Sequence, residues 1–506
     1  MYSLLNDGMI GAQLERLDDP VYLTLPDIIK ELRHEQLLSF TGLTPLQKRP
    51  WHMFLAQLDA LVQLKGKGNT IEERLLSLTD GNTHAWKLVA SDDEPAFLQP
   101  AFTYSSASIT PQGSDYLTRG YVSKDFDVKK NLAGLTPEQA IFGLVEVQTC
   151  ASYAGGGNYG ISRMYSGFGT RTFVTATPTL HRSKWHNRDV RMLRRVQDTI
   201  DLPKDGTMLL WTKPWDGTES TGLDPYTLHP LFIEVCRLIR LTKDLGVRTK
   251  STTSQRILCE DEDEVTRGLL SPIWGPINMA NSKGPTAYNP GGSAPFSYRN
   301  MPKLIFGTNG DIMASKAYDF KDGGDKKYIV CSVLCGGQCK TSGYHERIIE
   351  VPASNNGIFH GGAAKDRLRA ESQGRLTQAS QVNKILREAL YCLLGMQSQE
   401  EKSEISRAMN TEDFQVAVDK IFFEDLWSAG GGDEKARKAW IKRVIETAVD
   451  IYMSAEETAT GAQKWRQLSK ARGLLNGSLT KHFDYYVQFD APRSERVREF
   501  AKVPAS

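Results

Sequence analysis

The sequence predicts an α+β protein, with a large mixed N-terminal domain of helices and irregular sheets over residues 1–371 and a C-terminal four-helix bundle over residues 372–506. Two observations support this prediction. Helix start signals are mixed with stretches rich in Pro, Gly, Thr and Asn before about Glu371, and four long amphipathic patterns follow it. A chain of 506 residues that is 40% hydrophobic and 24% charged can also bury several cores.

Two helix starts stand out in the N-terminal domain. Thr44 is followed by a proline, which is typical of an N-cap and first helical position, and apolar residues recur after it at helical spacing. Thr136 and Gln139 have the spacing of a capping box ahead of a second helix, which glycines end soon after Tyr153. From about residue 171 to residue 325 the composition predicts mixed strands and long loops.

The C-terminal domain carries four helical patterns separated by glycine-containing connectors. They span residues 382–396, 414–427, 435–453 and 463–475. In the third pattern, apolar side chains form a stripe, while Lys438, Lys442 and Glu446 are expected to face water. Four amphipathic helices with short connectors are typical of a helical bundle.

The composition restricts the cellular compartment and the kinds of binding partner that we expect for the protein. No apolar run approaches the ~20 residues that span a bilayer, and the first residues lack the basic flank and apolar stretch of a signal peptide. Seven cysteines, an odd number, fit reduced thiols better than a disulfide framework. We therefore expect a cytoplasmic protein. Because 62 basic residues balance 60 acidic ones, only local patches are expected to bind nucleic acid.

One such basic patch is predicted between Ile161 and Arg195, where eight basic residues meet a single acid, Asp189, for a net charge of +7. Its members include Arg163, Arg171, Arg182 and Lys184. The patch follows a glycine-rich loop whose backbone N–H groups could hold phosphates together with these side chains. The alternative interpretation is a solvated charged face without a ligand.

The glycine-rich loop from Gly155 to Gly160 formally matches the G-x-G-x-x-G fingerprint of dinucleotide-binding proteins. Its context opposes that function, because a helix start rather than a strand precedes it and residues 178–184 contain no acid for a ribose. We therefore expect no nucleotide cofactor. A flexible loop is the better interpretation, in which glycine lets a ligand approach the backbone closely.

A cysteine-rich segment offers a competing hypothesis, a metal-dependent hydrolase. Cys331, Cys335, Cys339 and His345 are ligand types that zinc accepts, but their C-x3-C-x3-C-x5-H spacing is unusual and the first two fall at apolar, strand-like positions. His345 and Glu346 could serve as acid and base, or form a polar pair at the end of a hairpin. The sequence contains no G-x-S-x-G or H-E-x-x-H motif, which favours binding over catalysis.

Four segments carry a family resemblance. They are SLLNDGMI from Ser3 to Ile10, PAFLQP from Pro95 to Pro100, the glycine loop and its continuation to Val174, and GQCKTSGYHER from Gly337 to Arg347. Their order, the length and the C-terminal helices resemble the CasA family, the large subunit of the type I-E CRISPR Cascade complex, over almost the whole chain. Gly8 and Met9 depart from the family's Pro-Trp, and residues 161–195 are more basic than the family leads us to expect.

The resemblance implies a subunit without catalytic activity or cofactor, which takes part in antiviral defence. In such RNA-guided complexes the guide reads the target by base pairing, and protein reads a short protospacer-adjacent motif (PAM) in the duplex. The family reads the motif from the minor groove and helps to open the DNA for R-loop formation. The implied partners are double-stranded target DNA, the guide RNA with the other Cascade subunits, and a helicase-nuclease; no membrane contact is expected.

Transferred residue by residue, the resemblance implies the following DNA-binding positions. The glycine loop corresponds to Gly157, Asn158, Tyr159 and Gly160, and a wedge hairpin to Gln338, with Lys340 on the phosphates. The family's lysine finger has no clean match, and Arg267 lies in the corresponding stretch. A further loop to DNA or guide RNA corresponds to Phe126, Lys129, Lys130 and Asn131. The bundle is expected to touch target-strand backbone and neighbouring subunits. A free-standing DNA-binding regulator is the remaining alternative.

Overall fold

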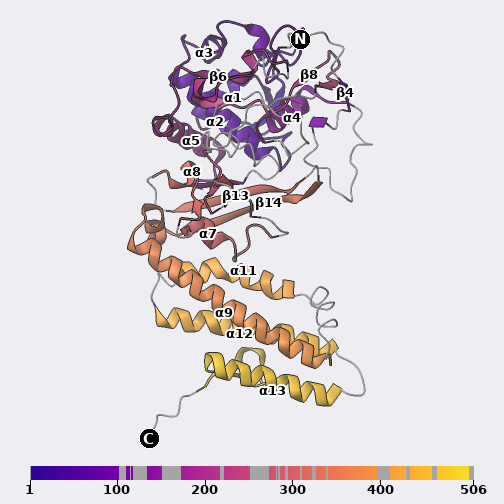
Figure 1. Cartoon of the computed structure of the whole chain (residues 1–506), viewed down its shortest axis with the longest axis vertical. Helices are drawn as coiled ribbons and strands as arrows, with labels where there is room; N and C mark the ends of the chain where they lie inside the picture. Colours follow the sequence, from indigo (N-terminus) through magenta and orange to yellow (C-terminus); the bar gives the residue numbers. More distant parts are fainter. Residues whose placement is uncertain are drawn as a thin grey trace. The chain divides into compact units, whose positions relative to one another are not determined.

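The computed structural model describes residues 2–101, 110–113, 116–117, 134–150, 172–216, 222–250, 273–280, 282, 285–290, 294–307, 310–321, 326–337, 340–395, 411–428, 433–458 and 464–500. The chain folds as two compact units (Figure 1). Unit 1 comprises Met1–Phe296 and Gly307–Glu350, and unit 2 comprises Ser297–Phe306 and Val351–Ser506. Residue 371, near which the sequence changes character, lies inside a helix of unit 2. The predicted α+β class is confirmed.

A small antiparallel sheet with the strand order β2-β1-β3 opens unit 1. Helix α1 lies between β2 and β3 in the sequence, and it starts at Thr24, whose hydroxyl accepts the backbone N–H of Asp27. The bounds are β1 (Ile10–Leu14), β2 (Val21–Leu23), α1 (Leu25–Arg33) and β3 (Leu37–Phe40). Both ends of β1 and the inner face of α1 contribute to the core of the unit.

Helix α2 (Lys48–Leu64) passes through the core of unit 1, where Trp51 and Phe54 are 0% exposed and stack with their ring centroids 5.6 Å apart. The predicted start at Thr44 is wrong. The Gln47 side chain accepts the backbone N–H and the hydroxyl of Thr44, at 3.3 and 2.9 Å, and closes a separate turn ahead of the helix. The helix therefore begins only at Lys48.

Helix α4 (Pro137–Cys150) begins with the predicted capping box, which is confirmed. The N–H of Gln139 donates to the Thr136 hydroxyl at 3.2 Å, and the N–H of Thr136 donates to the Gln139 side chain at 3.0 Å. Between them, Glu138 accepts the N–H of Gly11 at 2.7 Å. A Cβ at Gly42 would overlap the Glu138 carboxylate, so this close approach requires glycine.

Helix α5 (Arg182–Val196) lies in the stretch where the sequence predicted strands and loops, and that prediction is wrong. Its buried face combines the apolar Trp185 and Leu193 with the polar Ser183, His186 and Asp189. Polar residues on the inner face interrupt the apolar period, which is the main sequence signal for an amphipathic helix. The helix packs against α2 and α1.

The remaining strands of unit 1 form short sheets, apart from a long pair. Strands β13 (Lys327–Gly337) and β14 (Lys340–Val351) form a three-stranded sheet with β5 (Phe173–Thr177), in the order β14-β13-β5. Within it, β13 pairs antiparallel with β5. The other elements are α3 (Ile71–Ser77), β4 (Thr110–Gln112), β6 (Thr207–Leu209), β7 (Leu228–Ile233), β8 (Ile239–Leu241), β9 (Val247–Thr249), β10 (Ile277–Asn278), β11 (Thr286–Ala287), β12 (Ile312–Met313) and α8 (Lys316–Asp319).

Unit 2 contains the four predicted helices (Figure 1), and α9 packs against each of the other three. Its elements are α7 (Met301–Phe306), α9 (Ala363–Leu393), α11 (Thr411–Ser428), α12 (Glu434–Thr458), α13 (Lys464–Phe483), β15 (Tyr485–Val487) and β16 (Val497–Glu499). The bundle is thus confirmed, but α9 starts well before residue 382. Its first half buries the polar residues Glu371, Ser372 and Arg375, which again hide the apolar period.

Buried charges join the helices of the bundle. Arg375, which is 1% exposed, donates from Nε to Glu371 at 3.0 Å, and its guanidinium lies 5.0 Å from the centre of the Trp440 ring. The other oxygen of Glu371 accepts Nε of Arg437 at 2.8 Å. In the part of the chain that the structure describes, no helix is long and apolar enough to cross a membrane.

Candidate nucleic-acid interface

The expected hairpin is formed by β13 and β14, with residues 338 and 339 between them. Lys340 is the first residue of β14, directly after these two positions. The register runs from Tyr328 opposite Thr177 to Ser332 opposite Phe173, so the second half of β13 continues beyond its partner β5. The last residues of β13, from Val333 to Gly337, therefore extend beyond the part of the strand that pairs with β5.

An ion pair fastens β14 to helix α2. Arg49 Nη2 lies 2.7 Å from Glu346 Oε2, and the hydroxyl of Tyr344 donates to the same oxygen at 3.1 Å. The guanidinium of Arg49 also lies 4.9 Å from the ring centre of Trp185 and 5.4 Å from that of Phe173. The side chain of Arg49 is 11% exposed and that of Glu346 is 31% exposed, so the ion pair is covered on the arginine side and partly open at the carboxylate. Glu346 therefore has a structural partner, which does not fit the acid–base role considered from the sequence.

Sequence reasoning missed this ion pair, and its two residues are separated by 297 positions. The local signal was limited to a charged residue in an otherwise extended segment. The hydroxyl of Tyr344, two residues away on the same face of β14, also donates to Glu346 and helps to orient its carboxylate toward Arg49. The pair of Arg49 with Glu346 restricts how far β14 can move relative to α2, because it would have to break for the strand to move away.

The basic side chains of the predicted patch divide into exposed and covered groups. Lys184, Arg191, Arg194 and Arg195 are exposed on one side of α5. Arg182 is partly covered, with its guanidinium 5.4 Å from the ring centre of Phe40, and burial lowers its pKa to about 10. Arg188 is 1% exposed and belongs to the core. The cationic surface of α5 is therefore smaller than the sequence count indicated.

Arg188 instead connects α5 to the sheet that carries the hairpin. It donates to Asp189 at 2.7 Å, to the hydroxyl of Thr175 on β5 at 3.3 Å and to the carbonyl of Ala317 at 3.0 Å. The exposed cations of α5 and the β13–β14 hairpin are thus attached to the same strand, β5. This arrangement gives the two parts a shared rigid support within unit 1.

Two carboxylates complete the polar contacts between α2 and α5. Asp59 accepts from Arg33, Gln63 and His186, and Asp189 accepts from Arg188, His52 and Trp274. Although burial raises the pKa of Asp189, the charge of Arg188 and the bond from His52 outweigh it and hold that pKa at about 2. Burial lowers the pKa of His52 to about 4. At neutral pH Asp189 therefore stays charged and His52 stays neutral.

The cysteines of the proposed metal cluster are placed only in part. Cys331 and Cys335 are buried on β13, and burial raises the pKa of the Cys331 thiol to about 12. Metals bind the thiolate, so this environment favours a packing role for Cys331. Among the described residues, no group of three or more His, Cys, Asp or Glu side chains is arranged to hold a metal ion. Cys339 lies outside the described residues.

Several residues implied by the resemblance, and two members of the predicted basic patch, also lie outside the described residues. They are Phe126, Lys129, Lys130, Asn131, Gly157, Asn158, Tyr159, Gly160, Arg163, Arg171, Arg267 and Gln338. Of the residues implied by the resemblance, the structure therefore describes only the backbone of Lys340, and of the named patch residues it describes Arg182 and Lys184. These three belong to the hairpin and to α5, the two parts that β5 supports.

Comparison with solved structures places the arrangement among known folds. CasA from Thermus thermophilus matches with a TM-score of 0.66 at 13% identity, over 95% of this chain and 99% of that one. The chain has the CasA fold. Thermobifida fusca Cse1 matches with a TM-score of 0.66 at 14% identity, over 95% of this chain and 97% of that one. No family model and no curated protein matches the sequence.

A further match is a chain of a CRISPR RNA-guided surveillance complex, with a TM-score of 0.60 at 13% identity, over 94% of this chain and 99% of that one. Coverage at this level means that the CasA fold extends over both units. The low identity means that the likeness rests on architecture, and each side-chain role has to be argued from this chain's own contacts.

Proposed function

We propose that this protein is the large subunit of a type I-E CRISPR Cascade complex, where it reads a PAM in double-stranded DNA and helps to open the duplex. The observation that carries the proposal is the match to CasA structures over 95% of the chain and 99% of the matched chain. One of the matched chains belongs to an RNA-guided surveillance complex. In this role the protein is a binding subunit that performs no chemistry. Base pairing by the guide supplies the sequence recognition of the target.

The hairpin suits the opening step of this proposal. Inserting a wedge into a duplex costs a few kcal/mol per unstacked step, so the wedge must be held by a support that does not yield. Gln338 would occupy the connection between β13 and β14, and Lys340 would follow it on β14 near the phosphates. The contacts of Arg49 with Glu346, Trp185 and Phe173 supply a support of this kind.

The basic face of α5 suits the binding step. Lys184, Arg191, Arg194 and Arg195 would contact phosphates, which positions a protein on DNA without reading its sequence. Reading the motif is assigned to the glycine loop with Gly157, Asn158, Tyr159 and Gly160, because a loop with little side-chain bulk can approach base edges in the narrow minor groove. The partners in this proposal are target DNA, the guide RNA with other Cascade subunits, and a helicase-nuclease.

The first experiment tests membership in the complex. The chain is expressed with the products of its neighbouring genes, and we expect it to co-purify with a defined short RNA and several other subunits. The isolated chain should bind DNA weakly and with strong salt dependence. Tight site-specific binding by the isolated chain would favour a free-standing regulator, and stoichiometric zinc with hydrolytic activity would favour the metal-dependent enzyme.

The second experiment tests the roles within the complex. Gln338→Ala is expected to slow strand separation, measured by a fluorescent base analogue next to the motif, while initial duplex binding changes little. Asn158→Ala is expected to reduce discrimination between motifs. Lys326→Ala serves as the matched control, because Lys326 is half exposed at the far end of β13 and pairs with Glu350. Equal behaviour of all three variants would contradict the site assignment.

A further inference from the structure

One tryptophan of the chain is fully placed in water, and it lies on α13 in unit 2. The chain contains nine tryptophans, and eight of them are at most 6% exposed, whereas Trp465 is 81% exposed. Helix α13 packs against α9 and β15, and the indole of Trp465 lies on its uncovered side. Exposed tryptophan is typical of surfaces that bind a partner, because its large ring gains much from burial. The motif-reading role proposed above does not use this position.

A row of cations begins beside Trp465 on the same helix. Arg466, Lys470 and Lys481 are exposed, and their spacings of four and eleven residues place them on one side of the helix. Among the described residues, none of the three side chains has an ion pair or a hydrogen bond. From Lys464 to Phe483 the helix contains no acidic residue. The positive charge of this row is therefore not compensated on α13.

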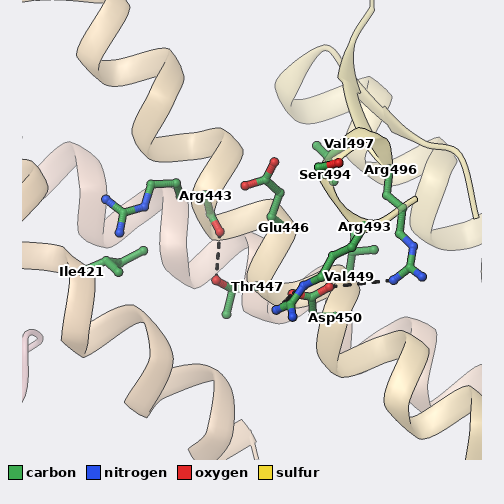
Figure 2. A pocket seen from close by; sticks show the side chains of 10 residues that line it. All are labelled: Ile421, Arg443, Glu446, Thr447, Val449, Asp450, Arg493, Ser494, Arg496 and Val497. Atoms are coloured by element: carbon green, nitrogen blue, oxygen red, sulfur yellow. Dashed lines mark hydrogen bonds and ion pairs between the residues drawn. The ribbon is translucent and has the colours of Figure 1, made fainter. Parts of the chain in front are cut away.

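The arginines of the neighbouring groove differ in this respect. In a groove of about 710 Å³ between α12 and the segment that leads into β16, Arg493 and Arg496 both lie against the carboxylate of Asp450 (Figure 2). Arg443, which also lines the groove, pairs with Asp425. Carboxylates of the same unit therefore compensate these three arginines. The cations of α13 lack such partners and remain available to an external anion.

Two glycines occupy the row between the cations. Gly473 and Gly477 lie on the same side of α13 as Lys470 and Lys481, and a Cβ added to either would meet no atom within 4 Å beyond its own helical turn. Contacts within the described chain therefore do not require glycine at these positions, although glycine disfavours a helix interior relative to alanine. Without side chains there, an elongated ligand can lie close to the helix between the two lysines.

An exposed aromatic ring beside unpaired cations is the combination that binds single-stranded nucleic acid. Bases stack on aromatic side chains, and cations follow the phosphates. In a duplex the bases already stack on one another, so a double helix offers no base face to the indole of Trp465. From Arg466 to Lys481 the row is about 22 Å long at 1.5 Å per residue, which accommodates several nucleotides.

We propose that the face of α13 formed by Trp465, Arg466, Lys470 and Lys481 binds single-stranded DNA, with one base stacked on the indole and phosphates at the three cations. The proposal rests on the proposed function, because opening of the target duplex supplies such a strand. An acidic segment of a partner protein would also pair with the cations, but its carboxylates leave the ring of Trp465 without a role.

The first test titrates the full-length protein with a 12-nucleotide oligothymidylate. We expect the oligonucleotide to quench the fluorescence of Trp465, since the other eight tryptophans are buried. Trp465→Ala is expected to abolish this quenching and to weaken binding about fivefold or more, measured by the anisotropy of a labelled oligonucleotide. Phe500→Ala is the matched control, because Phe500 is a half-exposed aromatic residue of unit 2 outside α13, and it should change the affinity less than twofold.

The second test uses the salt dependence of binding. For single strands, log K falls with log[salt] with a slope of about −0.7 for each contacted phosphate. Lys470→Gln and Lys481→Gln are each expected to make the slope shallower by about 0.7, whereas Trp465→Ala should leave it unchanged, since stacking involves no phosphate. Lys438→Gln is the control for the lysines, because Lys438 is exposed on α12 and pairs with Glu499. Thermal unfolding confirms that each variant is folded.

Several results would overturn the proposal. Unchanged binding in Trp465→Ala and Lys470→Gln would mean that the strand binds elsewhere on the chain. Tighter binding of a duplex, of oligouridylate or of oligoglutamate, with losses in the same variants, would assign the face to double-stranded DNA, RNA or an acidic protein. Failure to co-purify with Cascade subunits, with the quenching of Trp465 retained, would instead reject the proposed function and support the DNA-binding face.

Discussion

Two buried polar clusters, one in each unit, differ in how completely their charges are paired. Between α2 and α5, Asp59 and Asp189 each accept hydrogen bonds from three side chains. In the bundle, Arg375 is equally buried, but among the described residues its two terminal nitrogens have no hydrogen-bond partner, and Arg437 is 54% exposed. Around Asp189 the first cluster is sealed, because Arg188, His52 and Trp274 are at most 5% exposed. Its Asp59 end includes Arg33, which is 26% exposed, and the second cluster is open at Arg437.

This difference affects how each cluster should respond to the loss of one member. In a sealed cluster, removing a carboxylate leaves buried cations with no alternative partner. The folded state then bears the full desolvation cost of those cations without compensation. In an open cluster, water and a mobile arginine can compensate in part. The region that supports the hairpin should therefore be less tolerant of substitution than the bundle, and four predictions test this comparison.

The largest effect is expected for Asp189→Asn. The substitution keeps the shape but removes the charge that pairs with Arg188 and accepts from His52, so unit 1 should lose ~3 kcal/mol or more of unfolding free energy. Hydrogen exchange of α5 in the full-length protein measures the loss. The control is Asp198→Asn, which affects an exposed pair with Lys204 and should change little. Similar losses in the two variants would contradict the sealed-cluster interpretation.

The stability of the two units should respond differently to acid. Asp189, with its pKa held at about 2 against an ordinary 3.8, contributes stability that is present above pH 3.8 and is lost as the pH falls toward 2. His52, with its pKa lowered to about 4, contributes stability that is lost as the pH falls from about 6.5 to 4. Glu146 opposes this loss, because burial raises its pKa to about 8 and its protonation favours the folded state. In the bundle, burial raises the pKa of Asp425, so its protonation favours the folded state.

Below about pH 4, unit 1 should therefore unfold before the bundle, with a difference of ~2 kcal/mol from Asp189 alone. Limited digestion with pepsin, followed by mass spectrometry, measures which unit opens first. Early release of peptides from α9 and α12, with α2 and α5 still protected, would show that the bundle and not unit 1 is the acid-sensitive part.

A smaller effect is expected for Glu371→Gln in the bundle. Arg375 loses its carboxylate, but its guanidinium keeps the face of Trp440 and Arg437 can turn to water, so we expect a loss of ~2 kcal/mol. Chemical denaturation monitored by hydrogen exchange in α9 measures it. Asp366→Asn, at an exposed pair on the same helix, is the control. A loss larger than that of Asp189→Asn would reverse the comparison.

The smallest effect on stability is expected for Glu346→Gln, which weakens a partly exposed ion pair in unit 1 and should cost ~1 kcal/mol. Hydrogen exchange should nevertheless rise selectively in β14, because the pair with Arg49 fastens that strand. Glu350→Gln is the matched control, because Glu350 lies on the same strand, β14, and forms an exposed pair with Lys326. If both variants exchange alike, Arg49 does not anchor the hairpin.

Local signals in the sequence predicted those parts of the fold that depend on contacts between residues close together in the chain. The capping box of Thr136 and Gln139 depends on residues three apart, and the apolar stripes of the four bundle helices repeat within each helix. Helix α5 and the first half of α9 were missed because Asp189 and Arg375 occupy inward-facing positions that the apolar pattern reserves for hydrophobic residues.

The candidate site could be predicted less completely. The hairpin was expected through the family resemblance, but its anchor joins residues 49 and 346, and no local pattern indicates a pair so far apart. The basic patch was overestimated, since a charge count cannot distinguish the exposed Lys184 from the buried Arg188. That distinction depends on Asp189 and Thr175, which become neighbours of Arg188 only in the folded chain.

The contact of Glu138 with Gly11 and Gly42 has an evolutionary consequence. Because a side chain at position 42 would occupy the space of the Glu138 carboxylate, a substitution there would displace that carboxylate and cost its bond from Gly11. We expect proteins of this lineage to keep a glycine opposite a glutamate or to replace both, with a larger residue at position 42 accompanied by a shorter one at position 138.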